Sequence, residues 1–239
     1  MYPETSIVWN AFMSSEDGGI SKGSPEYAMI MNGDVRDEIA ELCRASHLGL
    51  AESAAALYIY PVSDASPYLA DANVQVVRNL KSQTREVARI HMHLANFICI
   101  AFMSLFYNNE TVGYRNSRAF ISNTGIIAEI DKILGEAVKN EGEGLGANFI
   151  SMAKAWDALS LISRTEGEGK IYVSATTKSG VVEGVMRYMR ENGLVRDIRG
   201  EAWEPTERLD ALIPIVFQDE RYRAAIAAYA DGLEGGRYA

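Results

Sequence analysis

The feature that most constrains this fold is a long stretch of chain, Asn73–Tyr107, that contains neither glycine nor proline. Apolar residues recur along it at the three- and four-residue spacing of one helix face. The residues of this apolar side are Val76, Val77, Leu80, Val87, Ile90, Leu94, Phe97 and Ile98. A helix over the whole stretch would be roughly 50 Å long. The spacing therefore predicts a long central helix as the spine of a mainly α-helical fold.

Basic residues line the opposite side of this predicted helix. Four of them fall within an arc of roughly 80°, and they are Arg78, Lys81, Arg85 and Arg89. The whole chain, in contrast, has a formal net charge of −9. A row of cations on one helix face can neutralise the phosphates of a nucleic-acid backbone. The alternative is a solvated face whose arginines pair with carboxylates elsewhere in this acidic chain.

A loop that combines arginines with aromatic residues is predicted to follow the central helix. Its relevant residues are Tyr114, Arg115, Arg118 and Phe120. In proteins that bind single-stranded nucleic acid, bases stack on aromatic rings while cations hold the backbone. We therefore predict an internal basic groove that binds single strands between this loop and the basic side of the helix.

Two segments of this region resemble a known family. They read TREVARIHMHLANFICIAF over residues 84–102 and YRNSRAF over residues 114–120. They resemble the central region of coat and nucleocapsid proteins of helical viruses, in particular the flexuous filamentous viruses. The sequence departs from that family in having Ile121 and Ser122 after Phe120, where an acidic residue is expected.

The resemblance implies a non-enzymatic structural protein that assembles into homo-oligomers or filaments on single-stranded nucleic acid, with RNA as the expected partner. The residues implied to hold phosphates are Arg85, Arg89, Arg115 and Arg118. Tyr114 or Phe120 would stack a base. The acidic remainder of the chain would then face outward.

A second segment, Ser179–Gly200, resembles a different family, the winged-helix regulators. Its predicted helix ends at Asn192-Gly193 and is followed by a short apolar stretch, as a recognition helix is followed by a wing. The residues that would face duplex DNA are Arg187, Arg190, Arg196 and Arg199. The helix that normally comes just before is missing, because Ile171–Ala175 has the alternation of a strand. The alternative is a helix packed on a small hairpin without a DNA-binding role.

The positions of turn-forming residues predict how the chain is organised. Glycines and Pro25 break up residues 1–33, which we expect to form an extended N-terminal arm. The helical core is expected over residues 34–230, with two lobes at 34–140 and 147–230, and residues 231–239 form a C-terminal tail. Within the core, residues 51–60 read as a helix, and residues 203–214 as irregular chain. A minor β-hairpin is expected from the strands Ile171–Ala175 and Leu194–Ile198.

Signatures of catalysis, cofactors and metals are weak in this sequence. The glycines at 142–146 follow no strand and precede no phosphate-binding lysine, which disfavours a nucleotide fold. His91 and His93 are about 200° apart on a helix, so they could not share a metal there. We therefore predict no catalytic residue, no cofactor and no metal. An enzyme or small-ligand protein that uses a pocket between helical lobes remains a third hypothesis.

The remaining expectations concern location. No signal peptide is visible, and Cys43 and Cys99 read as buried, reduced thiols. The longest apolar run, Leu94–Tyr107, is shorter than the ~20 residues of a membrane span. These features predict a protein of the cytoplasm or of a virion that is neither secreted nor embedded in a membrane.

Overall fold

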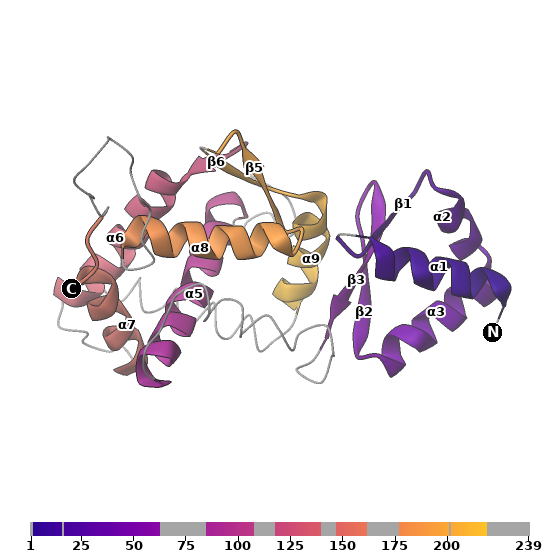
Figure 1. Cartoon of the computed structure of the whole chain (residues 1–239), viewed down its shortest axis with the longest axis horizontal. Helices are drawn as coiled ribbons and strands as arrows, with labels where there is room; N and C mark the ends of the chain where they lie inside the picture. Colours follow the sequence, from indigo (N-terminus) through magenta and orange to yellow (C-terminus); the bar gives the residue numbers. More distant parts are fainter. Residues whose placement is uncertain are drawn as a thin grey trace, which may run out of the picture.

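The protein folds into a smaller and a larger lobe (Figure 1). The computed structural model describes residues 2–15, 17–62, 85–107, 118–139, 147–161, 177–200 and 202–218. The smaller lobe contains α1 (Pro3–Ser14), β1 (Gly19–Ser21), α2 (Pro25–Ile30), α3 (Gly33–Ala45), β2 (Leu48–Glu52) and β3 (Ala56–Pro61). The larger lobe contains α5 (Arg85–Phe106), β4 (Ile121–Ser122), α6 (Asn123–Lys139), α7 (Ala147–Asp157), α8 (Lys178–Glu191), β5 (Val195–Ile198) and β6 (Ala202–Pro205). The last described helix is α9 (Glu207–Gln218).

Each lobe buries its own apolar cluster. In the smaller lobe, α1, α2 and α3 cover one face of the sheet around Phe12, Ile39 and Leu57. In the larger lobe, α5, α6, α7 and α8 surround a bigger cluster that includes Phe102 and Trp156. The larger cluster combines residues from both sides of 140–147, so the chain does not divide there as the sequence predicted. Residues 34–61 instead pack with residues 3–30 in the core of the smaller lobe.

The strand β3 is buried on both faces. It lies between β1 and β2 and pairs antiparallel with each. Side chains alternate along a strand, so Leu57 and Ile59 enter the core of the smaller lobe. Ala56 and Tyr58 point to the other face, where they pack with Ala211 of α9. The β1–β3–β2 sheet is therefore enclosed between the first three helices and α9.

The helix α9 joins the two lobes through opposite sides of its surface. Leu209 and Ile213 are part of the larger apolar cluster, whereas Ala211 faces Tyr58 of the smaller lobe. At the end of α5, the Tyr107 hydroxyl donates a hydrogen bond to Asp210 Oδ1 at 2.7 Å. These contacts fix α9 against both lobes.

Two glycines make room for the tyrosines of β3. A Cβ atom on Gly19 would lie 2.5 Å from the Tyr58 ring, and one on Gly49 would lie 2.4 Å from the Tyr60 ring. The strand register pairs the same residues, Gly19 with Tyr58 and Gly49 with Tyr60. Each ring therefore lies over a neighbouring strand at a position that any side chain would obstruct.

The two lobes repeat one topology. Each has a helix, a short strand, further helices and then a hairpin, and the larger lobe has α7 as an additional helix. The sheet orders are β1–β3–β2 and β4–β6–β5, so the third strand is central in both, and all neighbours are antiparallel.

The helices before the two hairpins, α3 and α8, also correspond. Each is followed by a residue in the left-handed region, His47 (φ 54°) after α3 and Gly193 (φ 66°) after α8. Counted back from these residues, the three buried positions of α3 coincide with three of the six buried positions of α8. They are Val35, Ile39 and Cys43 in α3 and Val181, Val185 and Met189 in α8.

The prediction of a mainly α-helical fold agrees with this structure, but several local predictions were wrong. Residues 3–30 form α1, β1 and α2 and fill the core of the smaller lobe, in place of an extended arm. Residues 51–60 were expected to be helical and instead contribute to β2 and β3, because pairing into the sheet outweighs their alanine content. The predicted central helix is described over Arg85–Phe106, and residues 73–84 lie outside the described residues.

The predicted hairpin is only partly recovered. The expected strand Leu194–Ile198 corresponds to β5, but its partner is β6, Ala202–Pro205. The strand predicted at residues 171–175, the last predicted helix at 219–230 and the tail at 231–239 lie outside the described residues. The chain near Pro205 and Pro214, expected to be irregular, forms β6 and α9.

Two further observations concern the predictions about membrane spans and about the two cysteines. No helix among the described residues is long and apolar enough to cross a bilayer. Cys43 and Cys99 are both free thiols. Burial raises the pKa of Cys43 to about 11 and that of Cys99 to about 12.

We predict that Leu57→Ala lowers the free energy of unfolding by about 2–5 kcal/mol, because it leaves a cavity in the enclosed strand. The measurement is urea denaturation followed by circular dichroism. Val62→Ala is the matched control, because Val62 follows the same strand and is 48% exposed. Equal losses for the two variants would contradict the burial of β3.

Candidate nucleic-acid interface

The helix α8 presents one face to the core and one to solvent. Its buried residues recur at helical spacing, from Val181 to Met189, while Arg187 and Arg190 are exposed on the other side. The Thr177 hydroxyl caps the helix by accepting a hydrogen bond from the Gly180 amide at 3.1 Å. Sequence alone explains this element, because the cap, the apolar period and the final Asn192-Gly193 all agree.

A cluster of three side chains holds the beginning of α8 against α6 and α7. Asp131 Oδ1 accepts hydrogen bonds from Trp156 Nε1 at 2.8 Å and from Lys178 Nζ at 2.7 Å. The Lys178 ammonium also lies over the Trp156 ring, 5.3 Å from its centroid. This cation–π contact and the ion pair fix the first turn of α8.

A second link holds the middle of α8 to the sheet through α6. Asn123 Oδ1 accepts a hydrogen bond from Trp203 Nε1 at 2.7 Å, and Asn123 Nδ2 donates one to Glu183 Oε2 at 2.9 Å. One amide therefore connects β6, α6 and α8. The exposed face of α8 keeps a fixed direction relative to the β5–β6 hairpin.

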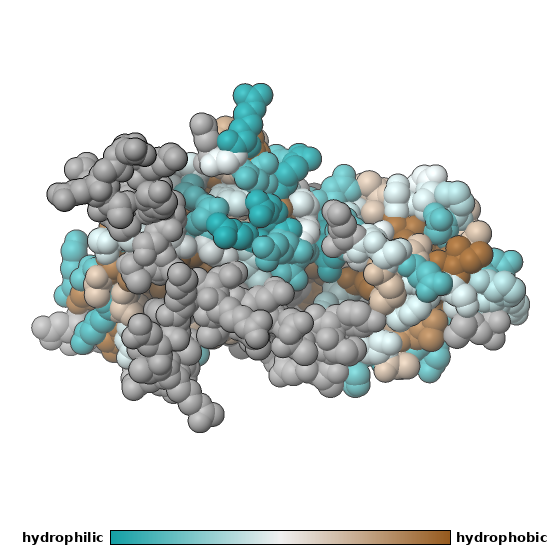
Figure 2. Space-filling view, viewed as in Figure 1, coloured by the Kyte–Doolittle hydropathy of each residue, from teal (hydrophilic) through white to brown (hydrophobic). Residues whose placement is uncertain are grey.

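Four arginines are exposed on α8 and the hairpin, and they are Arg187, Arg190, Arg196 and Arg199. Hydrophilic residues gather over these elements in Figure 2. Arg187 Nη2 lies 3.7 Å from Glu183 Oε1, one turn away. Arg196 pairs with Glu204 across the hairpin. The side chains of Arg187 and Arg196 are still 51% and 74% exposed, so these weak surface pairs leave them accessible.

The hairpin turn places an arginine at its tip. Arg199 and Gly200 both have positive φ, 58° and 74°. The Gly200 amide donates a hydrogen bond to Asp197 Oδ1 at 2.7 Å, which closes the turn. Arg199 therefore projects from the end of the hairpin rather than along its strands.

The equivalent helix of the smaller lobe has the opposite charge. Four acidic residues of α3 fall within an arc of about 100° on its outer side, and they are Asp34, Asp37, Glu38 and Glu41. Glu38 Oε2 accepts hydrogen bonds from Thr5 Oγ1 at 2.6 Å and from the Tyr2 amide at 2.8 Å. These bonds hold the pKa of Glu38 below its usual value. Phosphates would be repelled from this face.

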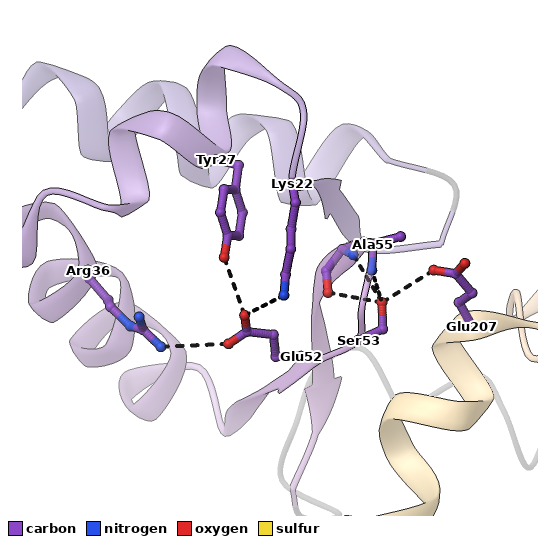
Figure 3. A network of polar contacts seen from close by, with 8 residues as sticks. Lys22, Tyr27, Arg36, Glu52, Ser53, Ala55 and Glu207 are labelled. Carbon is purple, nitrogen blue, oxygen red and sulfur yellow. Dashed lines mark hydrogen bonds and ion pairs between the residues drawn. The ribbon is translucent and has the colours of Figure 1, made fainter. Parts of the chain in front are cut away.

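Two cations of the smaller lobe lie around one carboxylate, as Figure 3 shows. Glu52 lies 2.7 Å from Lys22 Nζ and 4.0 Å from Arg36 Nη2, and it accepts a hydrogen bond from the Tyr27 hydroxyl at 3.3 Å. The Lys22 bond is the main reason that the pKa of Glu52 is lowered. The next residue, Ser53, donates a hydrogen bond to Glu207 of α9 at 3.3 Å (Figure 3).

The structure describes only part of the basic stripe predicted from the sequence. Arg85 and Arg89 belong to the first turns of α5, and their side chains are outside the described residues. Arg78, Lys81, Tyr114 and Arg115 also lie outside them. Arg118 and Phe120 are exposed immediately before β4, and Phe120 is 58% exposed. The predicted groove for single strands therefore stays a prediction.

The helix that the winged-helix resemblance requires directly before α8 stays untested, because residues 162–176 lie outside the described residues. Farther upstream, α6 packs against α8. The apolar period over residues 126–134 indicates α6 in the sequence.

Comparisons with known proteins identify a family without a described activity. The profile of one family, described as a family of unknown function (DUF6063), matches residues 18–237. This match includes most of the smaller lobe and the whole of the larger one. No curated protein and no solved structure matches the chain.

We predict that Asn123→Ala lowers the free energy of unfolding by about 1–3 kcal/mol, because it leaves the buried Trp203 indole N–H without its acceptor. Thermal and urea denaturation measure this loss. Asn10→Ala, at an exposed position of α1, is the control and should change stability much less. An unaltered stability of Asn123→Ala would show that the bridge does not hold α8.

Proposed function

We propose that this chain, which belongs to the DUF6063 family, is a DNA-binding protein with two winged-helix lobes, of which the larger one binds duplex DNA. The observation that carries the proposal is the exposed, arginine-bearing face of α8 beside the arginine-tipped β5–β6 hairpin.

The order of elements supports a winged-helix arrangement in each lobe. In such an arrangement, the helix before the hairpin is the recognition helix, and the hairpin is the wing. The recognition helix enters the major groove while the helix before it crosses the backbone. In the larger lobe these roles fall to α8, the β5–β6 hairpin and α6.

The charges support the larger lobe as the one that binds. Arg187 and Arg190 lie on the exposed face of α8, and Arg196 and Arg199 extend the positive surface onto the hairpin. Contacts of this kind neutralise phosphates and release counterions, so the affinity falls as salt is added. The acidic outer side of α3 makes the smaller lobe unsuited to the same task.

We predict that Arg187→Ala combined with Arg190→Ala weakens binding to a labelled duplex and reduces the salt slope by about 2, one for each lost phosphate contact. Fluorescence anisotropy over a series of salt concentrations measures both quantities. Binding weakens because each removed arginine takes away one phosphate contact. The fold should be kept, because both side chains are exposed.

The matched control removes the same charge from the smaller lobe with Arg36→Ala and Arg44→Ala. Arg44 lies three residues before His47, as Arg190 lies three before Gly193. The control should bind as the unaltered protein does. Equal weakening in both double variants would mean that net charge alone is responsible, and no salt-dependent binding in the unaltered protein would refute the proposal.

A second candidate function is assembly on single-stranded nucleic acid, in the cytoplasm or in a virion. The observation that favours it is the exposed Phe120 beside the exposed Arg118, an aromatic platform next to a cation. In this alternative the protein binds RNA and associates with itself.

We predict for this second candidate that Phe120→Ala weakens binding to single-stranded RNA by about 1–3 kcal/mol, the usual loss of one stacked base. Purified protein would carry nuclease-sensitive material that absorbs at 260 nm. The winged-helix function is supported if the variant with Arg187→Ala and Arg190→Ala no longer binds duplex DNA while Phe120→Ala binds it with unchanged affinity.

A further inference from the structure

A cavity of about 350 Å³ lies where the smaller lobe meets α8 and α9. Phe12, Ile59 and Tyr60 line it from the smaller lobe, and Tyr188, Arg208 and Leu212 line it from the other side. Its volume is near the lower end of the range for small-molecule sites, which is roughly 300–1,000 Å³. The walls are mostly apolar with a few polar groups, as in such sites generally.

The guanidinium of Arg208 is the main polar group of this cavity and is incompletely satisfied. Its Nη2 atom donates a hydrogen bond to the Ile59 carbonyl oxygen at 3.3 Å, and its Nε atom is buried without a hydrogen-bond partner. Among the described residues, no carboxylate forms a salt bridge with it. A buried donor without a partner is costly, and a charged one more so.

The backbone holds this guanidinium close to the strand. Gly18 has φ 65°, and a Cβ atom there would lie 3.2 Å from Nη1 of Arg208. Burial lowers the pKa of Arg208, and the negative charge of Asp17 opposes that shift. The Asp17 carboxylate is itself engaged, since Oδ1 accepts hydrogen bonds from Ser15 Oγ and from the Gly19 amide.

We propose that this cavity binds a small organic monoanion, a carboxylate or sulfonate on a compact apolar body, with Arg208 as its anchor. The anionic group would form the ion pair that the guanidinium does not make with any carboxylate among the described residues. The apolar body would fill the space between Phe12, Tyr188 and Leu212. Asp17 beside the arginine and Glu191 in the wall disfavour a second negative charge on the ligand.

The site goes beyond nucleic-acid binding, and its walls come from both lobes. Tyr188 belongs to the last turn of α8, while Ile59 belongs to β3. A molecule bound between them stabilises the folded chain by mass action and raises its melting temperature. The binding site does not depend on whether α8 contacts DNA, so the two proposals are tested separately.

The test titrates the full chain with 1-anilinonaphthalene-8-sulfonate, an aromatic monoanion that fluoresces in apolar sites. We expect saturable binding of one molecule, weakened about tenfold by Arg208→Met, since one charge-assisted hydrogen-bonding group is lost. The neutral analogue N-phenyl-1-naphthylamine should bind unaltered protein and Arg208→Met with equal affinity. Arg44→Met, at an exposed position of α3, is the control and should bind the sulfonate normally.

A second variant keeps the proposal testable if Arg208→Met fails to fold. Leu212→Trp fills the cavity from the partly exposed side of α9, so it should abolish binding of both probes while circular dichroism stays unchanged. Binding of the sulfonate by Leu212→Trp with unaltered affinity would overturn the proposal. A folded Arg208→Met that binds the sulfonate as tightly as the unaltered protein does would also overturn the proposal.

Discussion

The contact between β3 and α9 is the interaction on which the rest of the structure depends. Tyr58 and Ala56 of β3 meet Ala211 of α9 on one face of the small sheet, while Leu57 and Ile59 hold the helices of the smaller lobe on the other. The opposite side of α9 enters the larger core through Leu209 and Ile213. Burial of apolar surface on both sides of one strand and one helix therefore joins two separate cores. The cavity beside Arg208 lies along this same junction.

The repeated topology separates what the fold requires from what the function requires. Counted from His47 and Gly193, the three core positions of α3 match three core positions of α8, and they are apolar in both helices. One outer position reverses its charge, since Glu41 of α3 corresponds to Arg187 of α8, whereas Arg44 and Arg190 are both basic. The same packing arrangement thus occurs in both lobes, whereas the surface charges of the two lobes differ. In the proposed function, the larger lobe meets phosphates and the smaller lobe does not.

Local patterns predicted α8 and the strand that follows it, because a cap, an apolar period and a glycine in the left-handed region all indicate the same ends. Prediction failed where long-range pairing decides the structure. Ala51–Tyr60 has a composition that suits a helix, yet its residues pair into β2 and β3. The rings of Tyr58 and Tyr60 fit there because they lie over glycines of the neighbouring strands. The duplication of the lobes was not visible, since only burial and backbone conformation repeat. The cavity could not be predicted, because Arg208 and Ile59 are far apart in the chain.

Hydrogen–deuterium exchange of the full chain, measured with and without a duplex DNA, tests the central claim most directly. The proposed function predicts slower exchange on binding over residues 183–200, which include the exposed face of α8 and the hairpin tip, and no change over α3. Protection confined to α3, or to the segment around Phe120, with none over residues 183–200 would contradict it.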